Sequence, residues 1–147
     1  MKTQNKVLRL YKIFRIPHWI HFLGFPFLGV LISDLRFLSN LRSLFIVLIL
    51  SSSLLSFAYS FNDYLEGEDK GLEFIFPVLL SLFILPFLNT LQALIALTFI
   101  LLTAIYSLKL MYLPIVCTIT NTVGFMLLFL IGFFTSPSFT PTFFCFF

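Results

Sequence analysis

Long apolar stretches recur along the chain and restrict its possible folds more than any other feature. Five stretches carry almost no charge, at residues 17–33, 44–61, 72–88, 91–108 and 113–134. The hydrocarbon core of a bilayer is about 30 Å thick, and a helix needs about 20 mostly apolar residues to cross it. Lipid cannot hydrogen-bond to an open backbone, so such stretches cross a membrane as helices. The sequence therefore predicts an all-α, polytopic bundle of about five transmembrane helices.

The composition excludes an ordinary soluble domain. Hydrophobic residues make up 60% of the 147 residues, and charged residues make up only 10%. Soluble domains carry about 25% charged residues, and a chain this short leaves much of its surface exposed. We therefore expect an integral membrane protein with a basic N-terminal segment at 1–16, a transmembrane helical domain at 17–134 and an irregular apolar tail at 135–147.

The basic residues are distributed unevenly between the two sides of the predicted membrane domain. Five of the nine precede the first apolar stretch: Lys2, Lys6, Arg9, Lys12 and Arg15. Lys70 and Lys109 fall on the same side, whereas Arg36 and Arg42 fall on the other. Cytoplasmic loops carry the excess of Lys and Arg, so a cytoplasmic N-terminus is predicted. Beside apolar stretches, we expect the basic cluster to contact anionic lipid head groups rather than nucleic acid.

Acidic residues gather in one short segment. Five of the six lie between positions 63 and 73: Asp63, Glu66, Glu68, Asp69 and Glu73. If the second helix continues, Asp63 and Glu66 share one face, and Asn62 lies beside them. Mg²⁺ commonly takes one or two carboxylates and completes its shell with water and substrate phosphates. The segment predicts either a Mg²⁺–diphosphate site at a membrane face or a solvated loop that marks the membrane boundary.

Four stretches of the sequence share features with one family of membrane proteins. The segment FNDYLEGEDK, residues 61–70, resembles the motif NDxxDxxxD, which is the first aspartate-rich motif of the UbiA family of membrane prenyltransferases and closes the second helix there. Asn62 and Asp63 match its first two positions and Glu66 takes the next acidic position. Lys70 occupies the last acidic position of the motif, and Asp69 lies one residue before it. RIPHWIHFLGFP, YSLKLMYLP and TNTVGFMLLFLIG resemble the family's entrance to the first helix, the loop after the fourth helix and the fifth helix.

The resemblance implies a function and a set of site residues. Family members transfer an isoprenoid from its diphosphate to a lipophilic or aromatic acceptor, with Mg²⁺ held against the diphosphate. By this resemblance Asp63 and Glu66 are the expected catalytic residues, and they bind Mg²⁺ together with Asp69. The residues expected to contact the diphosphate are Asn62, Tyr106, Lys109 and Arg15.

The resemblance covers about the first half of a family member, and the second aspartate-rich motif is absent because no acidic residue follows Glu73. One interpretation is a prenyltransferase that is truncated and inactive alone, or that a second polypeptide completes. The other is a non-catalytic integral membrane protein, a subunit or relic of such an enzyme. A small transporter is less consistent with the sequence, which has no internal repeat and, apart from Glu73 at the start of the third stretch, no charge within the stretches.

Two further residues carry expectations about their surroundings. Trp19, between His18 and His21 near the start of the first stretch, is expected to anchor that helix at the membrane interface. Asn121 lies inside the fifth apolar stretch, where a polar side chain either bonds to a neighbouring helix or faces a cavity.

Overall fold

The computed structural model describes residues 11, 15–33, 41–67, 72, 74–110 and 113–135, and all regular structure among them is helical. In chain order the elements are α2 (Ile16–Trp19), the 3-10 turn η1 (Ile20–Leu23), α3 (Gly24–Ser33), α4 (Leu41–Glu66), α5 (Ile75–Ile84), the 3-10 turn η3 (Leu85–Phe87), α6 (Thr90–Ile105), the π-helical turn η4 (Tyr106–Leu110) and α7 (Pro114–Phe133). The prediction of an all-α protein is confirmed for this part of the chain.

Four of these helical stretches are long and apolar enough to cross a membrane. They are Ile16–Ser33, which combines α2, η1 and α3, then Leu41–Glu66, Thr90–Leu108 and Pro114–Phe133. They correspond to the first, second, fourth and fifth apolar stretches of the sequence. Such a set of helices is consistent with an integral membrane protein. The cytoplasmic position of the N-terminus stays a prediction.

The third apolar stretch forms a shorter helix than expected. A span was predicted over 72–88, but the helix covers Ile75–Phe87, of which α5 supplies 10 residues and η3 supplies 3. At about 1.5 Å per residue it reaches roughly 20 Å, less than the ~30 Å hydrocarbon core. From Leu85 the last turn tightens into a 3-10 turn that contains Pro86, and Leu88 is already extended. The predicted bundle of five spans is thus corrected, within the described residues, to four candidate spans and one short apolar helix.

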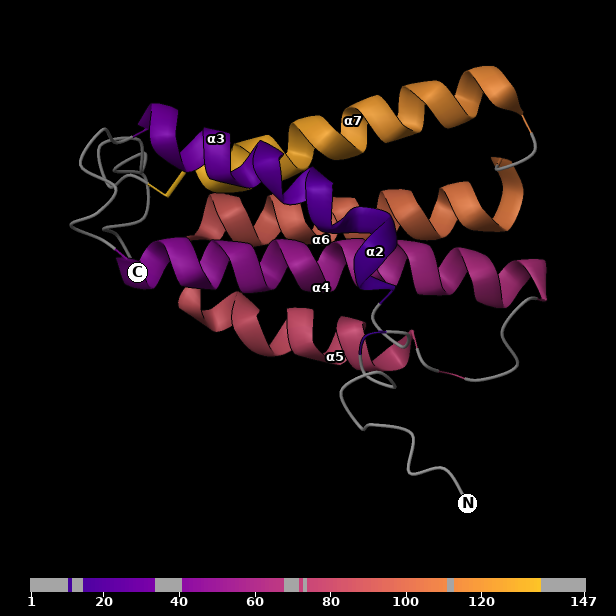
Figure 1. Cartoon of the computed structure of the whole chain (residues 1–147), viewed down its shortest axis with the longest axis horizontal. Coiled ribbons are helices and arrows are strands. Elements are labelled where there is room, and N and C mark those ends of the chain that lie inside the picture. Colours follow the sequence, from indigo (N-terminus) through magenta and orange to yellow (C-terminus); the bar gives the residue numbers. More distant parts are fainter. Residues whose placement is uncertain are drawn as a thin grey trace.

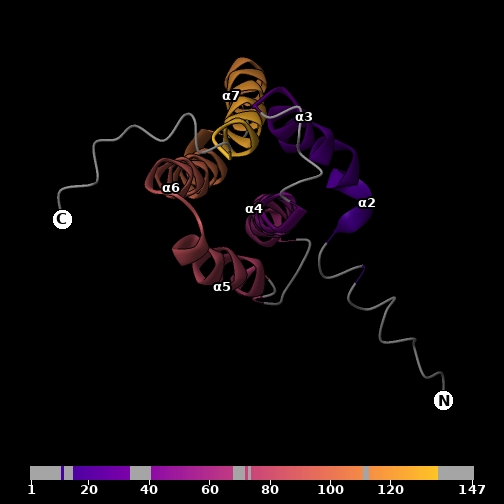
Figure 2. The same cartoon turned by 90° about the vertical axis from the view of Figure 1, so that its left-hand side faces the viewer.

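The helices lie side by side along one axis and alternate in direction (Figure 1). Seen along that axis, α4 occupies the middle of the bundle, and α3, α7, α6 and α5 surround it (Figure 2). The most extensive contact between two helices is the one between α3 and α7. These helices lie near opposite ends of the described part of the chain.

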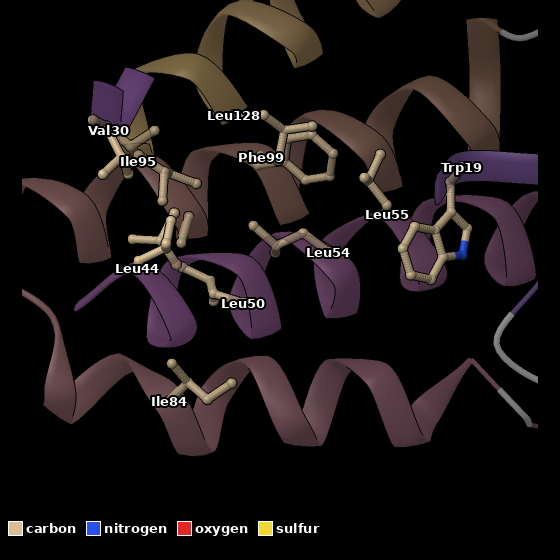
Figure 3. Packing of buried hydrophobic residues seen from close by; sticks show 13 residues of the cluster. Trp19, Val30, Leu44, Leu50, Leu54, Leu55, Ile84, Ile95, Phe99 and Leu128 are labelled. Carbon is tan, nitrogen blue, oxygen red and sulfur yellow. The ribbon is translucent and has the colours of Figure 1, made fainter. Parts of the chain in front are cut away.

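The hydrophobic core follows α4 through the bundle (Figure 3). Leu50 and Leu54 of α4 are fully buried, as is Leu128 of α7. Trp19 also belongs to this core and is only 4% exposed. The expectation that its indole anchors the first helix at the membrane interface is therefore wrong, because the ring packs inward onto α4.

One end of the bundle is closed by backbone contacts and buried amides. Side chains at Gly29 and Gly132 would collide with the facing backbone, so α3 and α7 touch there without side chains between them. Asn89 forms a capping box with Gln92 at the start of α6. The Asn89 amide also donates to the Phe134 carbonyl at 2.7 Å, and the Gln92 amide donates to the Ile131 carbonyl at 2.7 Å. These bonds tie the start of α6 to the end of α7.

Candidate functional site

A cavity of about 370 Å³ lies among α4, α6, η4 and α7. The walls are mostly apolar and aromatic: Phe22, Leu55, Ala58, Phe99, Leu102, Gly124 and Phe125. Phe22 of η1 stacks on Phe125 of α7, with ring centroids 4.4 Å apart. Pockets of about 300–1,000 Å³ with apolar walls and a few polar groups are typical of small-molecule sites.

Polar side chains also line this cavity. They come from the end of α4 (Tyr59 and Asn62), from α6 and η4 (Thr103, Tyr106 and Ser107) and from α7 (Thr120 and Asn121). Asn121 therefore faces the cavity. Of the two alternatives left open for it, a bond to a neighbouring helix or a position facing a cavity, the second is the one observed. Its amide donates to the Cys117 sulfur at 3.6 Å, one turn earlier on α7. The phenol of Tyr106 lies beside the same thiol.

The last turns of α4 carry three of the predicted site residues. The helix continues through Asn62 and Asp63 to Glu66 and ends at Gly67, whose φ of 76° suits a residue without a side chain. With 26 residues, α4 is about 39 Å long, more than the ~30 Å hydrocarbon core. A helix that long can place its charged end in the interfacial region while its apolar part crosses the lipid.

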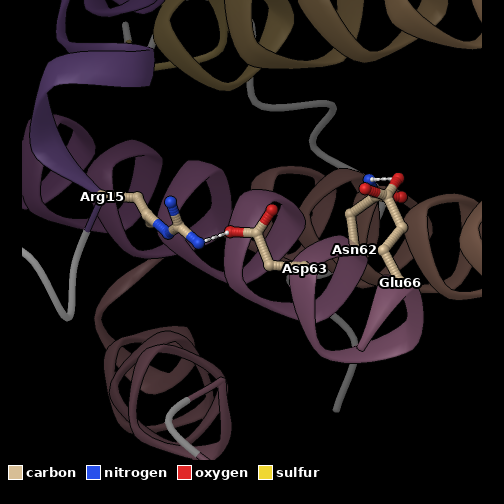
Figure 4. Close-up of polar contacts among 4 residues, drawn as sticks. All are labelled: Arg15, Asn62, Asp63 and Glu66. Atoms are coloured by element: carbon tan, nitrogen blue, oxygen red, sulfur yellow. Dashed lines mark hydrogen bonds and ion pairs between the residues drawn. The ribbon is translucent and has the colours of Figure 1, made fainter. Parts of the chain in front are cut away.

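The two carboxylates on this turn have different partners (Figure 4). Asp63 forms an ion pair with Arg15, with 2.6 Å between the carboxylate Oδ2 and the guanidinium Nη2. Glu66 accepts a hydrogen bond of 2.6 Å from the Asn62 amide nitrogen. The sequence placed Asp63 and Glu66 on one face, but their carboxylates have separate partners: Asp63 reaches Arg15, the residue before α2, and Glu66 bonds along α4.

Two residues that line the cavity each carry a buried side-chain oxygen with no hydrogen-bond partner among the described residues. These atoms are the side-chain carbonyl Oδ1 of Asn62 and the hydroxyl Oγ of Ser107. Ser107 is only 4% exposed. An unpaired polar atom buried in an apolar wall costs free energy, so such atoms commonly mark the place of a water molecule or a ligand.

The predicted site residues divide into three groups. Asn62 and Tyr106 line the cavity. Asp63, Glu66 and Arg15 lie at the adjoining end of α4. Asp69 and the side chain of Lys109 lie outside the described residues.

The family resemblance includes Ser107 but implies no role for it, although this cavity-lining residue carries a buried hydroxyl without a hydrogen-bond partner among the described residues. The sequence carried one signal for it, because Ser107 follows Tyr106 at the end of an otherwise apolar helix.

The donor chemistry at the end of α4 suits Mg²⁺. Asp63, Glu66 and the Asn62 carbonyl are hard oxygen donors, and Mg²⁺ often takes only one or two carboxylates from the protein. Within the described ranges, no group of three or more His, Cys, Asp or Glu side chains lies together as a ready metal site. A bound ion would therefore depend on water and substrate oxygens for the rest of its shell.

No protein-family model, curated protein or solved structure matches this chain.

Proposed function

We propose that this chain is a UbiA-like integral membrane prenyltransferase that binds an isoprenoid diphosphate at the end of α4. One observation carries the proposal: Asn62 and Tyr106, which the family resemblance implies as diphosphate contacts, line the same aromatic cavity. They come from different helices and lie 44 positions apart in the chain. A polar rim above apolar walls matches the two halves of a prenyl diphosphate.

In the proposed reaction, the bond between C1 of the isoprenoid and the diphosphate oxygen breaks, and its electron pair leaves with the diphosphate. A bond then forms from C1 to the acceptor, which loses a proton. Mg²⁺ would supply charge neutralisation for the leaving diphosphate. Asp63 and Glu66 would hold the ion, and the Tyr106 hydroxyl can donate to a diphosphate oxygen. Phe22, Phe99 and Phe125 would exclude water and present aromatic faces to the developing allylic cation.

Arg15 has a double role in this proposal. In the structure it neutralises Asp63, whose side chain is only 16% exposed. Binding of Mg²⁺ and diphosphate would exchange partners, because Asp63 would turn to the cation and Arg15 to the diphosphate oxygens. Asp69 and Lys109 stay in the proposed site as further ligands of the ion and the diphosphate. A second polypeptide would supply the missing acidic motif.

The Arg15–Asp63 ion pair also favours a second candidate, a non-catalytic integral membrane protein. In that case the pair is structural, and it joins the entrance of α2 to the end of α4. The two candidates differ in one measurable property, which is Mg²⁺-dependent binding of a prenyl diphosphate.

The first experiment measures binding of geranyl diphosphate to the full chain in lipid nanodiscs, with Mg²⁺ and with EDTA. Asp63→Asn removes one proposed ligand of the ion. Glu68→Gln removes one negative charge from the same acidic segment and serves as the matched control. We expect binding that needs Mg²⁺, that falls at least tenfold in Asp63→Asn and that changes little in Glu68→Gln. Equal binding with EDTA, or no binding by protein that is folded, would favour the non-catalytic candidate.

A second test concerns Tyr106. Tyr106→Phe removes one hydroxyl from the cavity rim, whereas Tyr64→Phe removes one from an exposed position on the last turns of α4. A lost hydrogen bond to a charged group costs about 1.5–3 kcal/mol, so we expect diphosphate binding to weaken by roughly 10-fold to 100-fold in Tyr106→Phe only. Equal effects of the two substitutions would remove Tyr106 from the site.

A further inference from the structure

The first helical stretch departs from regular α-helix at three places. Arg15, the residue before α2, has a φ of 50° and a ψ of 32°, and it is the one non-glycine residue in the described ranges with a positive φ. Trp19, with a φ of −125° and a ψ of −9°, separates α2 from η1. The turn η1 is itself a 3-10 stretch inside an apolar span. A 3-10 stretch within a helix often marks a hinge or a sequence under strain.

Both ends of this irregular stretch contact other helices. At the start, Arg15 forms its ion pair with Asp63 of α4 at 2.6 Å (Figure 4). Near the end, Phe22 lines the cavity and stacks on Phe125 of α7, with ring centroids 4.4 Å apart. Residues 15–23, which we call the strap, therefore connect the charged end of α4 to the aromatic wall of the cavity.

The helix that follows the strap is held in place. A β-carbon at Gly29 of α3 would collide with the backbone of α7, and a β-carbon at Gly132 of α7 would collide with the backbone of α3. Because the two backbones touch, α3 cannot turn against α7 without separating from it. A change in the winding of the strap must therefore appear as a rotation of the strap relative to α3.

The ion pair also helps to hold the backbone at Arg15. The left-handed region costs free energy for a residue with a β-carbon, because that carbon comes too close to the following carbonyl oxygen. Such a conformation persists only where the surrounding contacts maintain it. The Asp63 carboxylate, which is mostly buried, supplies one such contact. When it is lost, we expect Arg15 to return to an ordinary backbone region and to redirect the chain that enters α2.

We propose that the strap is an autoinhibitory contact, closed while Arg15 pairs with Asp63 and opened when a cation binds the Asp63 carboxylate in place of the guanidinium. Release lets η1 relax from a 3-10 turn to α-helix, a change of about 20° per residue. Phe22 lies two residues before α3, so it rotates about the helix axis by roughly 40° and leaves its stack on Phe125. The wall of the cavity opens at this point.

The trigger rests on the proposed function, in which Mg²⁺ arrives with a prenyl diphosphate. A divalent cation on the Asp63 carboxylate repels the guanidinium of Arg15, and the diphosphate oxygens offer that guanidinium a bidentate partner. The event that fills the charged end of α4 thus also opens the wall for the isoprenoid chain. The coupling is reciprocal, so a chain that displaces Phe22 also weakens the ion pair.

The single tryptophan reports on the strap, because Trp19 lies within it and is buried against α4 (Figure 3). Arg15→Gln and Asp63→Asn each remove the ion pair without any ligand. In the full chain in lipid nanodiscs, we expect both to move the Trp19 emission to longer wavelength and to increase its quenching by acrylamide, since a released indole moves toward the membrane interface. Arg42→Gln is the matched control on the first turn of α4, and it should change neither signal.

A second label reports on the cavity wall. With 4-fluorophenylalanine in place of Phe22, the fluorine resonance depends on the stack with the Phe125 ring. This resonance should shift when Arg15→Gln is added. The same label in place of Phe83, which is exposed on α5, should not shift. An ion pair with a purely structural role would loosen Trp19 and leave the resonance at position 22 unchanged.

The proposal is overturned if the resonance at position 22 stays unchanged in Arg15→Gln protein whose helical circular dichroism shows it to be folded. Asp63→Asn provides the same test if Arg15→Gln does not fold. Mg²⁺ and geranyl diphosphate are then added to the wild type. Binding that reproduces the shifts supports the strap, and binding without them overturns the strap alone. Shifts in the variants without Mg²⁺-dependent diphosphate binding keep the strap and reject the prenyltransferase function.

Discussion

Substitution of Gly132 by alanine should destabilise the bundle, although alanine is the better helix former. Gly132 lies on α7 where that helix touches α3. A β-carbon there would overlap the Pro26 carbonyl oxygen and would lie 2.9 Å from the Pro26 carbonyl carbon. Both atoms belong to the backbone, so no side-chain rotation can make room.

The expected magnitude combines two opposing effects. Replacing glycine by alanine inside a helix stabilises that helix by about 0.5–1 kcal/mol. Overpacking of a close contact costs about 1–3 kcal/mol, because the helices must separate and lose contacts along their interface. The net loss in the free energy of unfolding for Gly132→Ala is therefore about 0–2.5 kcal/mol, and relative to a glycine-to-alanine change that meets no obstacle it is about 1–3 kcal/mol.

Gly124→Ala provides the matched control on the same helix. Its β-carbon would meet only the Phe99 ring, at 3.5 Å, which is an ordinary contact. Unfolding by SDS in mixed micelles, followed by the emission of the single tryptophan, gives both stabilities. We expect Gly124→Ala to be as stable as the wild type or slightly more so. The reasoning fails if Gly132→Ala unfolds at the same SDS fraction as Gly124→Ala.

Three other predictions concern residues whose contacts are defined. Asn89→Ala should lower the free energy of unfolding by about 1–2 kcal/mol, because it removes a helix N-cap together with the donor to the Phe134 carbonyl. Asn89→Asp keeps the cap and should lower it less, and the same SDS unfolding measures both variants. Arg15→Gln and Asp63→Asn should show favourable coupling of about 1 kcal/mol in a double-mutant cycle, since each single change leaves a half-buried charge without this partner, and additive effects would contradict it. Trp19 should emit at short wavelength and resist quenching by aqueous iodide, and a red-shifted, readily quenched emission would refute its burial.

Apolar length predicted most of the helices. The runs at 17–33, 91–108 and 113–134 agree with helical spans to within a few residues. The second helix extends to Glu66, past its apolar run, because asparagine and acidic residues can continue a helix that lipid no longer surrounds. The third was predicted too long because hydropathy counts apolar residues such as Leu72 and Leu88, which lie outside the helix Ile75–Phe87.

Side-chain pairs were predictable only where they are local. The Asn62–Glu66 bond joins residues four apart on one helix, a spacing that sequence alone reveals. The Arg15–Asp63 pair joins two helices, so it depends on the path of the chain into α2. The prediction that Trp19 lies at the membrane interface was wrong for the same reason. An amphipathic ring suits either an interface or a core, and only the packing of α2 on α4 decides between them.

At the closed end of the bundle, α7 is held in place near its last turns, so a tilt of the helix would pivot there. Its fixed points, at Gly132 and at the carbonyls held by Asn89 and Gln92, all lie near the last turns of the helix. At about 1.5 Å per residue, Asn121 lies roughly 16 Å from Gly132, so a tilt of about 5° moves it by more than 1 Å. A small rotation of α7 about its fixed end therefore changes the width of the cavity near Asn121.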